Sequence, residues 1–221
     1  MTAVDFETAR RNMIENQIRC CKILDPVLLD TLETTPREDF LPEHIRSLAY
    51  MEGRVPLPCG QEMLSPLHEA NILHSLNLTG DERVLEIGTG TGYLTALLAL
   101  HAKHVDSYEI HEELADLARK NLQAHGITNA NVVTANAMQA DCLKGNYKYD
   151  VIVLGAALEE VPQHILGKLK NNGKLAAFIG TGPVISQVCM ERIGKAWSQT
   201  EICETQLVGM EGLAERREFV F

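Results

Sequence analysis

A strand, a glycine-rich loop and a helix follow one another over residues 83–102, and this segment limits the fold more than any other. Residues 83–87 form a short apolar run typical of a buried strand, and residues 93–102 have the apolar content of a buried helix. Gly88, Gly90 and Gly92 lie between them. Alternate glycines allow a tight turn and let a ligand lie against bare backbone, beside the free amides that begin the helix. The segment therefore predicts a ligand site where the strand meets the helix.

The pattern of strand followed by helix continues along the chain. Further strands are predicted over residues 104–109, 130–135, 149–154 and 173–179, and further helices over residues 112–125 and 162–169. Such alternation predicts a doubly wound, parallel sheet. Residues 199–208 and 215–221 are two more strand candidates, joined by a short loop without a helix. By analogy with known folds, we expect an α/β protein with a Rossmann-like methyltransferase fold, in which a mostly parallel sheet ends in an antiparallel C-terminal strand.

An N-terminal helical segment is predicted to precede this sheet. Helices are expected over residues 5–20, from Pro26 onward and over residues 66–77. Asp25 and Ser65 have the position and side-chain type of N-caps. Residues 50–66 are rich in proline and glycine and are expected to be irregular. We expect residues 1–78, the helical segment and a loop leading into the active site, to pack as one compact unit on an α/β domain of residues 79–221.

Two classes of ligand compete for the glycine loop. A dinucleotide favours the spacing G-x-G-x-x-G and places a pyrophosphate at the helix, whereas the spacing here is G-x-G-x-G and Glu86 precedes it. S-adenosylmethionine carries an ammonium and a sulfonium group, which a nearby carboxylate attracts. Glu109, nineteen positions after Gly90 at the end of the next strand, is placed to accept both ribose hydroxyls. The loop and its two acids favour S-adenosylmethionine over NAD, and over a loop that only turns the chain.

The acidic composition bears on which partners the chain has. The 221 residues carry a formal net charge of -10, which disfavours a nucleic-acid binder, because such proteins usually present a basic face. No stretch is long and apolar enough to span a bilayer, and the N-terminus lacks the apolar core of a secretory signal. The cysteines and histidines lack the spacing of a metal site. We therefore expect a cytoplasmic protein without a metal, nucleic-acid or membrane partner.

Several motifs resemble those of the protein-L-isoaspartate O-methyltransferases, over nearly the whole chain. The similar segments are residues 11–18, 25–28, 35–42, 50–61, 84–93, 150–153 and 156–162. Among them, residues 50–61 resemble the family sequence Y-x-D-x-P-L-P-I-G-x-G-Q, and residues 84–93 resemble its cofactor motif. The resemblance implies methylation of isoaspartyl carboxylates in damaged proteins, a repair activity with S-adenosyl-L-methionine as cofactor. Its partners would be proteins or peptides that bear isoaspartyl residues.

The glycine loop and the resemblance together assign the cofactor contacts. The expected contacts are Glu86, Gly88, Thr89, Gly90, Thr91, Gly92, Glu109, Ile110, Asn136 and Ala137. After the third strand the family carries G-D-G, whereas this chain has alanine, Asn136 and alanine in succession. An asparagine carbonyl can still accept a hydrogen bond from the adenine amine, although without charge.

The chain departs from the family on the substrate side. The family follows G-Q with T-I-S-x-P; here Glu62 stands at the Thr position and Leu64 at the Ser position, with Ser65 one residue away. Glu62 and Ser65 are therefore the candidate catalytic residues. A carboxylate would repel an anionic acceptor, but Glu62 can also face solvent, pair with Arg54, or receive a cationic or neutral substrate. Three functions stay open: an isoaspartyl methyltransferase, a methyltransferase of the same fold with another acceptor, and a cofactor-binding paralogue without catalysis.

Overall fold

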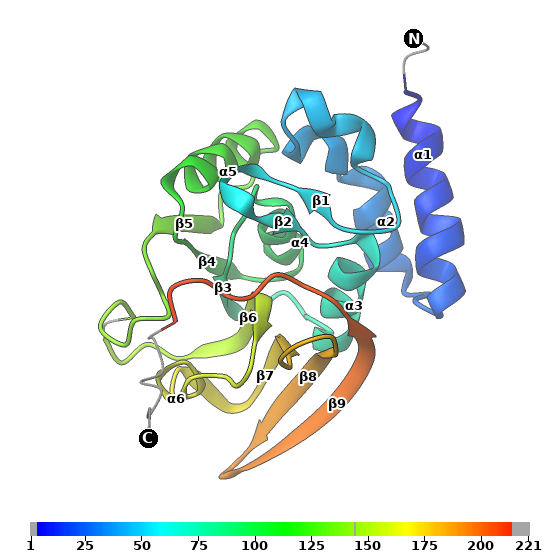
Figure 1. Cartoon of the computed structure of the whole chain (residues 1–221). Helices are drawn as coiled ribbons and strands as arrows, with labels where there is room; N and C mark the ends of the chain where they lie inside the picture. The colour runs from blue at the N-terminus through cyan, green and yellow to red at the C-terminus, as the bar shows by residue number, and fades with distance from the viewer. Residues whose placement is uncertain (1–3, 144, 214–221) are drawn as a thin grey trace.

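A seven-stranded sheet runs through the centre of the computed structural model, which describes residues 4–143 and 145–213 (Figure 1). The strands are β3 (Arg83–Ile87), β4 (His104–Glu109), β5 (Ala130–Thr134), β6 (Tyr149–Leu158), β7 (Leu169–Ile179), β8 (Ile185–Ile193) and β9 (Ala196–Thr205). Their order across the sheet is β5-β4-β3-β6-β7-β8-β9. The first five in this order are parallel, and β8 runs antiparallel to both of its neighbours. The predicted Rossmann-like, mostly parallel α/β fold is confirmed.

Helices and short turns fill the remaining chain. The helices are α1 (Phe6–Met13), α2 (Pro26–Thr34), α3 (Pro66–Leu76), α4 (Tyr93–His101), α5 (Glu112–Ala124) and α6 (Gln163–Leu166). The turns are η1 (Ile14–Ile18), which is π-helical, and the 3-10 turns η2 (Arg19–Cys21), η3 (Arg37–Phe40), η4 (Glu43–Leu48) and η5 (Pro58–Gly60). A small antiparallel hairpin joins β1 (Val55–Pro56) to β2 (Glu62–Met63). Within the described residues, no helix combines the length and the apolar character needed to cross a bilayer.

Each face of the sheet packs against its own apolar layer, because successive side chains along a strand point to opposite faces. On one face, Val84 and Phe178 belong to a core that continues through α3 and α4 to the N-terminal helices. On the other face, Leu85 and Ile152 pack against α6 and residues 137–143. The N-terminal helices therefore share a hydrophobic core with one face of the sheet.

Both predicted N-caps are confirmed. The carboxylate of Asp25 accepts the backbone N–H of Val27 at 2.8 Å, at the start of α2. The hydroxyl of Ser65 accepts the backbone N–H of His68 at 3.3 Å, at the start of α3. Each of these side chains satisfies an amide that has no partner inside the helix.

The helix predicted over residues 5–20 is broken into three parts. The α-helical hydrogen bonding of α1 gives way to the π-helical turn η1 and then to η2, which ends at Lys22 in the left-handed conformation (φ 65°). Met13, Ile14 and Ile18 are all buried, so the apolar spacing that predicted the helix is present. Apolar spacing marks the buried face of a helix but does not distinguish α from π hydrogen bonding.

The C-terminal strands also differ from the prediction. The predicted strand over residues 199–208 is found as β9, a few residues earlier, and it forms a hairpin with β8, which the sequence patterns missed. Gln187, in the middle of β8, is 1 % exposed and hides the apolar pattern of that strand. Its side chain is satisfied by α3, because it donates to the carbonyl of His68 and accepts from Asn71. The predicted strand over residues 215–221 lies outside the described residues.

Candidate functional site

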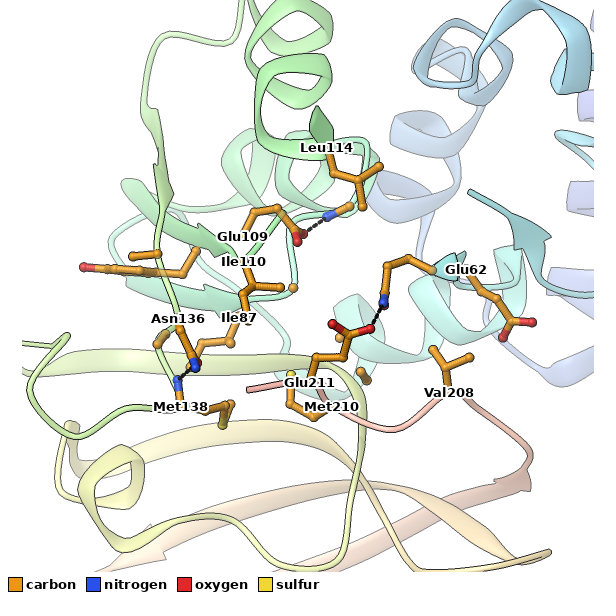
Figure 2. A pocket seen from close by; sticks show the side chains of 18 residues that line it. Glu62, Ile87, Glu109, Ile110, Leu114, Asn136, Met138, Val208, Met210 and Glu211 are labelled. Carbon is orange, nitrogen blue, oxygen red and sulfur yellow. Dashed lines mark hydrogen bonds between the residues drawn. The ribbon is translucent and has the colours of Figure 1, made fainter. Parts of the chain in front are cut away.

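A cavity of about 590 Å³, including the part open to solvent, lies at the carboxyl ends of β3, β4 and β6 (Figure 2). The order of the strands reverses between β3 and β6, and ligands of open α/β sheets bind at such a switch point. The lining residues are Gln61, Glu62, Ile87, Gly88, Gly90, Tyr108, Glu109, Ile110, Leu114, Ala135, Asn136, Ala137, Met138, Gly155, Ala156, Val208, Met210 and Glu211.

A second, smaller cavity of about 340 Å³ adjoins the first one. The two cavities share the lining residues Glu62, Gly88, Gly90 and Gly155. The second cavity is further lined by Leu57, Met63, Leu64, Glu69, Thr89, Thr91, Tyr93 and Leu94. The hydroxyl of Thr91 is buried and has no hydrogen-bond partner within the described residues. An unpartnered buried hydroxyl beside a cavity is suited to a polar ligand.

The glycines of the loop meet two different steric demands. Gly88 approaches β6 so closely that a Cβ on Gly155 would lie 2.9 Å from the Gly88 carbonyl oxygen. Gly92 precedes α4 with a φ of 88°, and a Cβ there would lie 3.1 Å from the Cβ of Ala118 on α5. The absence of a side chain at Gly155 therefore leaves room for the loop at Gly88 between β3 and β6, whereas Gly92 allows α4 and α5 to pack together.

Glu109 ends β4 and lines the first cavity, where it is 4 % exposed. One of its carboxylate oxygens accepts the backbone N–H of Gly90 at 2.8 Å, and the other accepts the N–H of His111 at 3.0 Å. A carboxylate oxygen can accept more than one hydrogen bond, so both oxygens keep the capacity to bind a ligand. The side chain thus fixes the glycine loop and faces the cavity at the same time.

Glu86 does not line either cavity, which corrects the expectation that it contacts the cofactor. On β3 it points to the same face as Val84, toward α4, and is fully buried. Its Oε2 accepts hydrogen bonds from the hydroxyls of Thr95 (2.5 Å) and Ser107 (2.6 Å). Burial raises the pKa of Glu86 to about 7, and these two hydroxyls oppose the rise.

The network around Glu86 reaches the glycine loop. The hydroxyls of Ser107 and Thr89 lie 2.6 Å apart. Because Ser107 gives its single proton to Glu86, Thr89 is the donor in this contact. Thr89 therefore lines the second cavity with its hydroxyl turned toward β4. Glu86 therefore stabilises the glycine loop through Ser107 and Thr89 and does not itself bind a ligand there.

A strap formed by residues 206–211 closes the first cavity from the C-terminal side. Its backbone pairs with β6, since the N–H of Ala157 donates to the carbonyl of Val208 at 2.9 Å and the N–H of Met210 donates to the carbonyl of Ala157 at 2.6 Å. Glu211 then accepts a hydrogen bond from Gln61 at 2.5 Å and lies 3.2 Å from the Nε2 of His111. The strap joins the loop after β1 to the loop after β4 through these two contacts, and Figure 2 draws the one from Gln61 to Glu211 as a dashed line.

The charge lining the first cavity is negative. The carboxylates of Glu62, Glu109 and Glu211 line it, and no lysine or arginine does so within the described residues. Such a lining attracts a cationic ligand and repels a pyrophosphate. The cavity combines this charge with apolar walls from Ile87 and Leu114.

Known proteins with this sequence pattern form one family. The family model for protein-L-isoaspartate(D-aspartate) O-methyltransferase (PCMT) matches residues 8–210. The chain belongs to this family. A PCMT relative from Koribacter versatilis is 31% identical over 215 residues, covering 96% of each chain. A second relative, protein-L-isoaspartate O-methyltransferase 2 from Marinobacter nauticus, is 35% identical over 210 residues, covering 94% of this chain and 95% of its own.

The fold is also that of solved PCMT structures. The structure of PCMT from Plasmodium falciparum, in complex with S-adenosyl-L-homocysteine, superposes with a TM-score of 0.76 at 19% identity. The match covers 94% of this chain and 98% of that one. This similarity confirms the architecture in which the two cavities lie.

The residues that replace the PCMT family's T-I-S-x-P motif take different places. Glu62 lines both cavities and forms an ion pair with Arg54, with 2.6 Å between Oε2 and Nη1. Of the arrangements that the sequence left open for Glu62, the structure has the pairing with Arg54. Ser65 lines neither cavity, because its hydroxyl caps α3. Its candidate catalytic role is therefore not supported by its position.

The other predicted contacts divide between the cavities. Gly88, Gly90, Glu109, Ile110, Asn136 and Ala137 line the first cavity. Gly88, Thr89, Gly90 and Thr91 line the second cavity. Gly92, like Glu86, lines neither cavity. The carbonyl oxygen of Asn136 accepts the N–H of Met138 at 3.0 Å, and its amide donates to the carbonyl of Gly212 at 2.9 Å, so the side chain is held in place beside the cavity.

Several lining residues were not predicted from the sequence. Gly155 carries a recognisable signal, because an isolated glycine within a strand often marks a close approach of backbone or ligand. Val208, Met210 and Glu211 carry no such signal. They reach the cavity only because the β8–β9 hairpin returns the chain to the carboxyl end of β6.

Proposed function

We propose that this chain is an S-adenosylmethionine-dependent methyltransferase that methylates the carboxylate of isoaspartyl residues in proteins. The observation that carries the proposal is the cavity at the switch point, which is lined by three carboxylates and, within the described residues, by no basic side chain. Membership of the PCMT family supports the choice of an isoaspartyl acceptor.

The residues present fit the proposed cofactor. Glu109 is placed to accept ribose hydroxyls at the end of β4. Ile110 and Ala137 offer apolar contacts for an adenine ring, and Asn136 offers a carbonyl oxygen for its amine. The unpartnered hydroxyl of Thr91 and the amides at the start of α4 suit the carboxylate of an amino acid. When bound, S-adenosylmethionine supplies a methyl group on a positively charged sulfur.

Catalysis then requires little from the chain beyond position. A carboxylate acceptor is already ionised at neutral pH, so no strong base has to remove a proton from it. The cofactor would extend from the first cavity to Thr91 in the second, and the acceptor would meet it near Glu62, which lines both cavities. The strap covers the first cavity on one side, which favours the exclusion of water from the reactants. The residues of the site are therefore expected to act mainly by orienting the two reactants.

Methyl transfer from labelled S-adenosylmethionine to an isoaspartyl peptide tests the proposal. The control is the same peptide with a normal aspartyl residue. We expect label in the isoaspartyl peptide alone, as an ester that alkali hydrolyses. Equal labelling of both peptides, or labelling of neither while S-adenosylhomocysteine still binds, would contradict the proposed acceptor and leave the cofactor assignment standing.

A further inference from the structure

The arginines near the two cavities are distributed unevenly. In the first cavity, Glu109 is held by backbone amides and Glu211 by Gln61 and His111, so neither is paired with an arginine. In the second cavity, Glu62 pairs with Arg54 and Glu69 pairs with Arg37. Glu62 lines both cavities, so Arg54 neutralises charge where they meet, whereas no arginine of the described residues pairs with Glu109 or Glu211.

Arg54 and Arg37 differ in what they can still bind. Arg37 is 0 % exposed, and its three nitrogens donate to Ala49, Leu64 and Glu69. Arg54 uses only Nη1, toward Glu62, among hydrogen bonds of the described residues, and its side chain is 29% exposed. Arg54 thus keeps free donors and access to solvent, which Arg37 lacks.

The β1–β2 hairpin fixes where this pair stands. Pro56 is directly opposite Glu62, and Arg54 lies two residues before Pro56, so the long Arg54 side chain reaches Glu62 diagonally. Glu62 lies where the two cavities meet, and Figure 2 shows its side chain directed away from Glu109 and Glu211. The pair therefore stands at the end of the site that is remote from the cofactor acids.

Within the described residues, neither cavity is lined by a lysine or an arginine. His68 lies within range of the Arg54 charge, and burial, followed by that charge, lowers the pKa of His68 to about 4. At neutral pH His68 is therefore uncharged. Arg54 lines neither cavity itself, but through its ion pair with Glu62 it brings an accessible positive charge to the edge of this end of the site.

We propose that Arg54 binds the carboxylate of the methyl acceptor, and that Glu62 holds the guanidinium in place at the junction of the cavities until the acceptor arrives. This inference rests on the proposed function, because it assigns the recognition of an anionic acceptor. An arginine fork can hold one carboxylate oxygen through Nη2 or Nε while Nη1 stays on Glu62. The other carboxylate oxygen is then left to receive the methyl group. Arg54 is an acceptor-binding residue that acts on specificity and not on the cofactor.

A simpler role for Arg54 makes a different prediction. If Arg54 only neutralised Glu62, then removing both charges together would restore acceptor binding. If Arg54 contacts the acceptor, the double variant still lacks that contact. The variants Arg54→Gln, Glu62→Gln and the double variant separate these two roles.

The experiment measures KM and kcat for an isoaspartyl peptide, together with calorimetric binding of S-adenosylhomocysteine. Arg54→Gln is expected to raise the KM for the peptide at least about tenfold, because it removes a charge-assisted hydrogen bond. The affinity for S-adenosylhomocysteine should stay unchanged. Glu62→Gln is expected to lower KM, because it removes the negative charge that repels the acceptor while the glutamine carbonyl can still accept from Arg54. In the double variant KM should stay at least about fivefold above the KM of Glu62→Gln. The double variant still lacks the contact between Arg54 and the acceptor, and that contact accounts for most of the tenfold rise.

The surface pair of Arg19 and Glu15 provides the matched control. It makes an ion pair of 2.9 Å with both side chains more exposed, and neither residue lines a cavity. Arg19→Gln should leave KM and cofactor affinity unchanged. A double variant of Arg54 and Glu62 with the KM of Glu62→Gln would overturn the inference alone. Failure of the wild-type protein to methylate the isoaspartyl peptide would instead overturn the proposed function, and this inference with it.

Discussion

Glu109 contacts the polypeptide through both of its carboxylate oxygens, and this explains why one residue can serve the loop and the ligand together. The amides of Gly90 and His111 fix the carboxylate in a nearly buried position. A ligand hydroxyl that binds there meets a group whose orientation is already set, so little conformational entropy is lost on binding. We expect a residue held in this way to contribute to the affinity for the proposed cofactor.

Replacing Glu109 by glutamine tests that role. Glutamine keeps the size of the side chain but removes the charge and one of the two acceptor oxygens. Because a hydrogen bond to a charged group contributes roughly 1.5–3 kcal/mol, S-adenosylmethionine should bind at least about tenfold more weakly in calorimetry. Glu112→Gln, on the outer surface of α5, is the control. An unchanged affinity of Glu109→Gln for S-adenosylmethionine would show that Glu109 does not contact the cofactor.

Glu86 gives a prediction about pH. Its folded pKa of about 7 lies above the ordinary value of 4.5, so the folded state holds the proton more tightly than the unfolded state. The stability that follows is fully present below pH 4.5 and is lost as the pH rises through 7. For a shift of this size the loss is on the order of 3 kcal/mol.

Thermal melting of the wild type and of Glu86→Gln between pH 4.5 and 8 measures this loss. Glutamine cannot ionise, so the difference in Tm, wild type minus variant, should fall as the pH rises. The folded pKa of His68 is about 4, so the protein also loses stability at acid pH as this histidine takes up a proton. That loss of stability is common to both proteins and cancels in the difference of Tm. A difference that stays constant with pH would show that Glu86 is not buried as an acid.

At the scale of single elements, α3 joins the acceptor side of the site to the sheet. Its first turn follows directly from residues 62–64, which line the second cavity. Its remaining turns pack against β7 and β8. The N-cap at Ser65 therefore fixes the point at which the lining segment becomes a helix.

Ser65→Ala distinguishes a capping role from a catalytic one. Loss of an N-cap costs about 1 kcal/mol, which lowers Tm by roughly 2–4 °C in a protein of this length. Because the hydroxyl lies outside both cavities, kcat and KM at a temperature well below Tm should stay within about twofold of wild type. Ser65→Thr, which can also cap the helix, should recover the lost stability. A large fall in kcat with an unchanged Tm would show that Ser65 takes part in the reaction.

The strap is the second element that matters for function. Its side-chain contacts at Glu211 are partly exposed, with 47% of that side chain accessible, so each contact is worth well under about 1 kcal/mol. Glu211→Ala should therefore speed the release of S-adenosylhomocysteine by only about two- to fivefold in a stopped-flow displacement assay. Glu204→Ala, an exposed position on β9, is the control. An unchanged release rate would show that the strap does not limit exit.

At the scale of the whole molecule, Arg37 connects parts of the chain that are distant in sequence. Its Nε donates to the carbonyl of Ala49 at 2.7 Å, and its other nitrogens donate to the Leu64 carbonyl and to Glu69. The guanidinium lies 4.9 Å from the centre of the Tyr93 ring on α4. One buried side chain thus fixes the N-terminal segment, the lining segment and α3 against the α/β core.

Arg37→Met should be the most destabilising of the substitutions considered. It leaves the carboxylate of Glu69 buried without its cation, which typically costs 3–5 kcal/mol. Denaturant unfolding should show this loss. The double variant Arg37→Met, Glu69→Leu should recover a large part of it, because two apolar side chains leave no buried charge. A double variant less stable than the single one would contradict this account.

Much of the fold could be predicted from local patterns. The strand–glycine loop–helix segment, the alternation that follows it and the N-caps at Asp25 and Ser65 are all determined by residues close together in sequence. β8 was missed because the buried Gln187 finds its partners on α3, more than one hundred residues away, and at Cys203 on the following strand β9. A polar residue with a distant partner has no local signature.

The site was predictable to the same extent. The glycine loop and Glu109 follow from their positions at strand ends, which local patterns locate. The direction of Glu86 depends on which face of β3 is covered by α4, and both faces of this strand are buried, so alternation gives no indication. The strap residues reach the cavity through the long return of the β8–β9 hairpin. These features come from the assembled fold.

The position of the strap has a consequence for how the molecule is made. The chain supplies the glycine loop early and the cover of the same cavity at residues 206–211. While a ribosome is still producing the β8–β9 hairpin, the crevice beside β6 stands open on that side, and a nucleoside that enters it has no cover. We therefore expect a chain that ends before residue 206 to lack this cover and to hold the proposed cofactor less firmly than the complete strap allows.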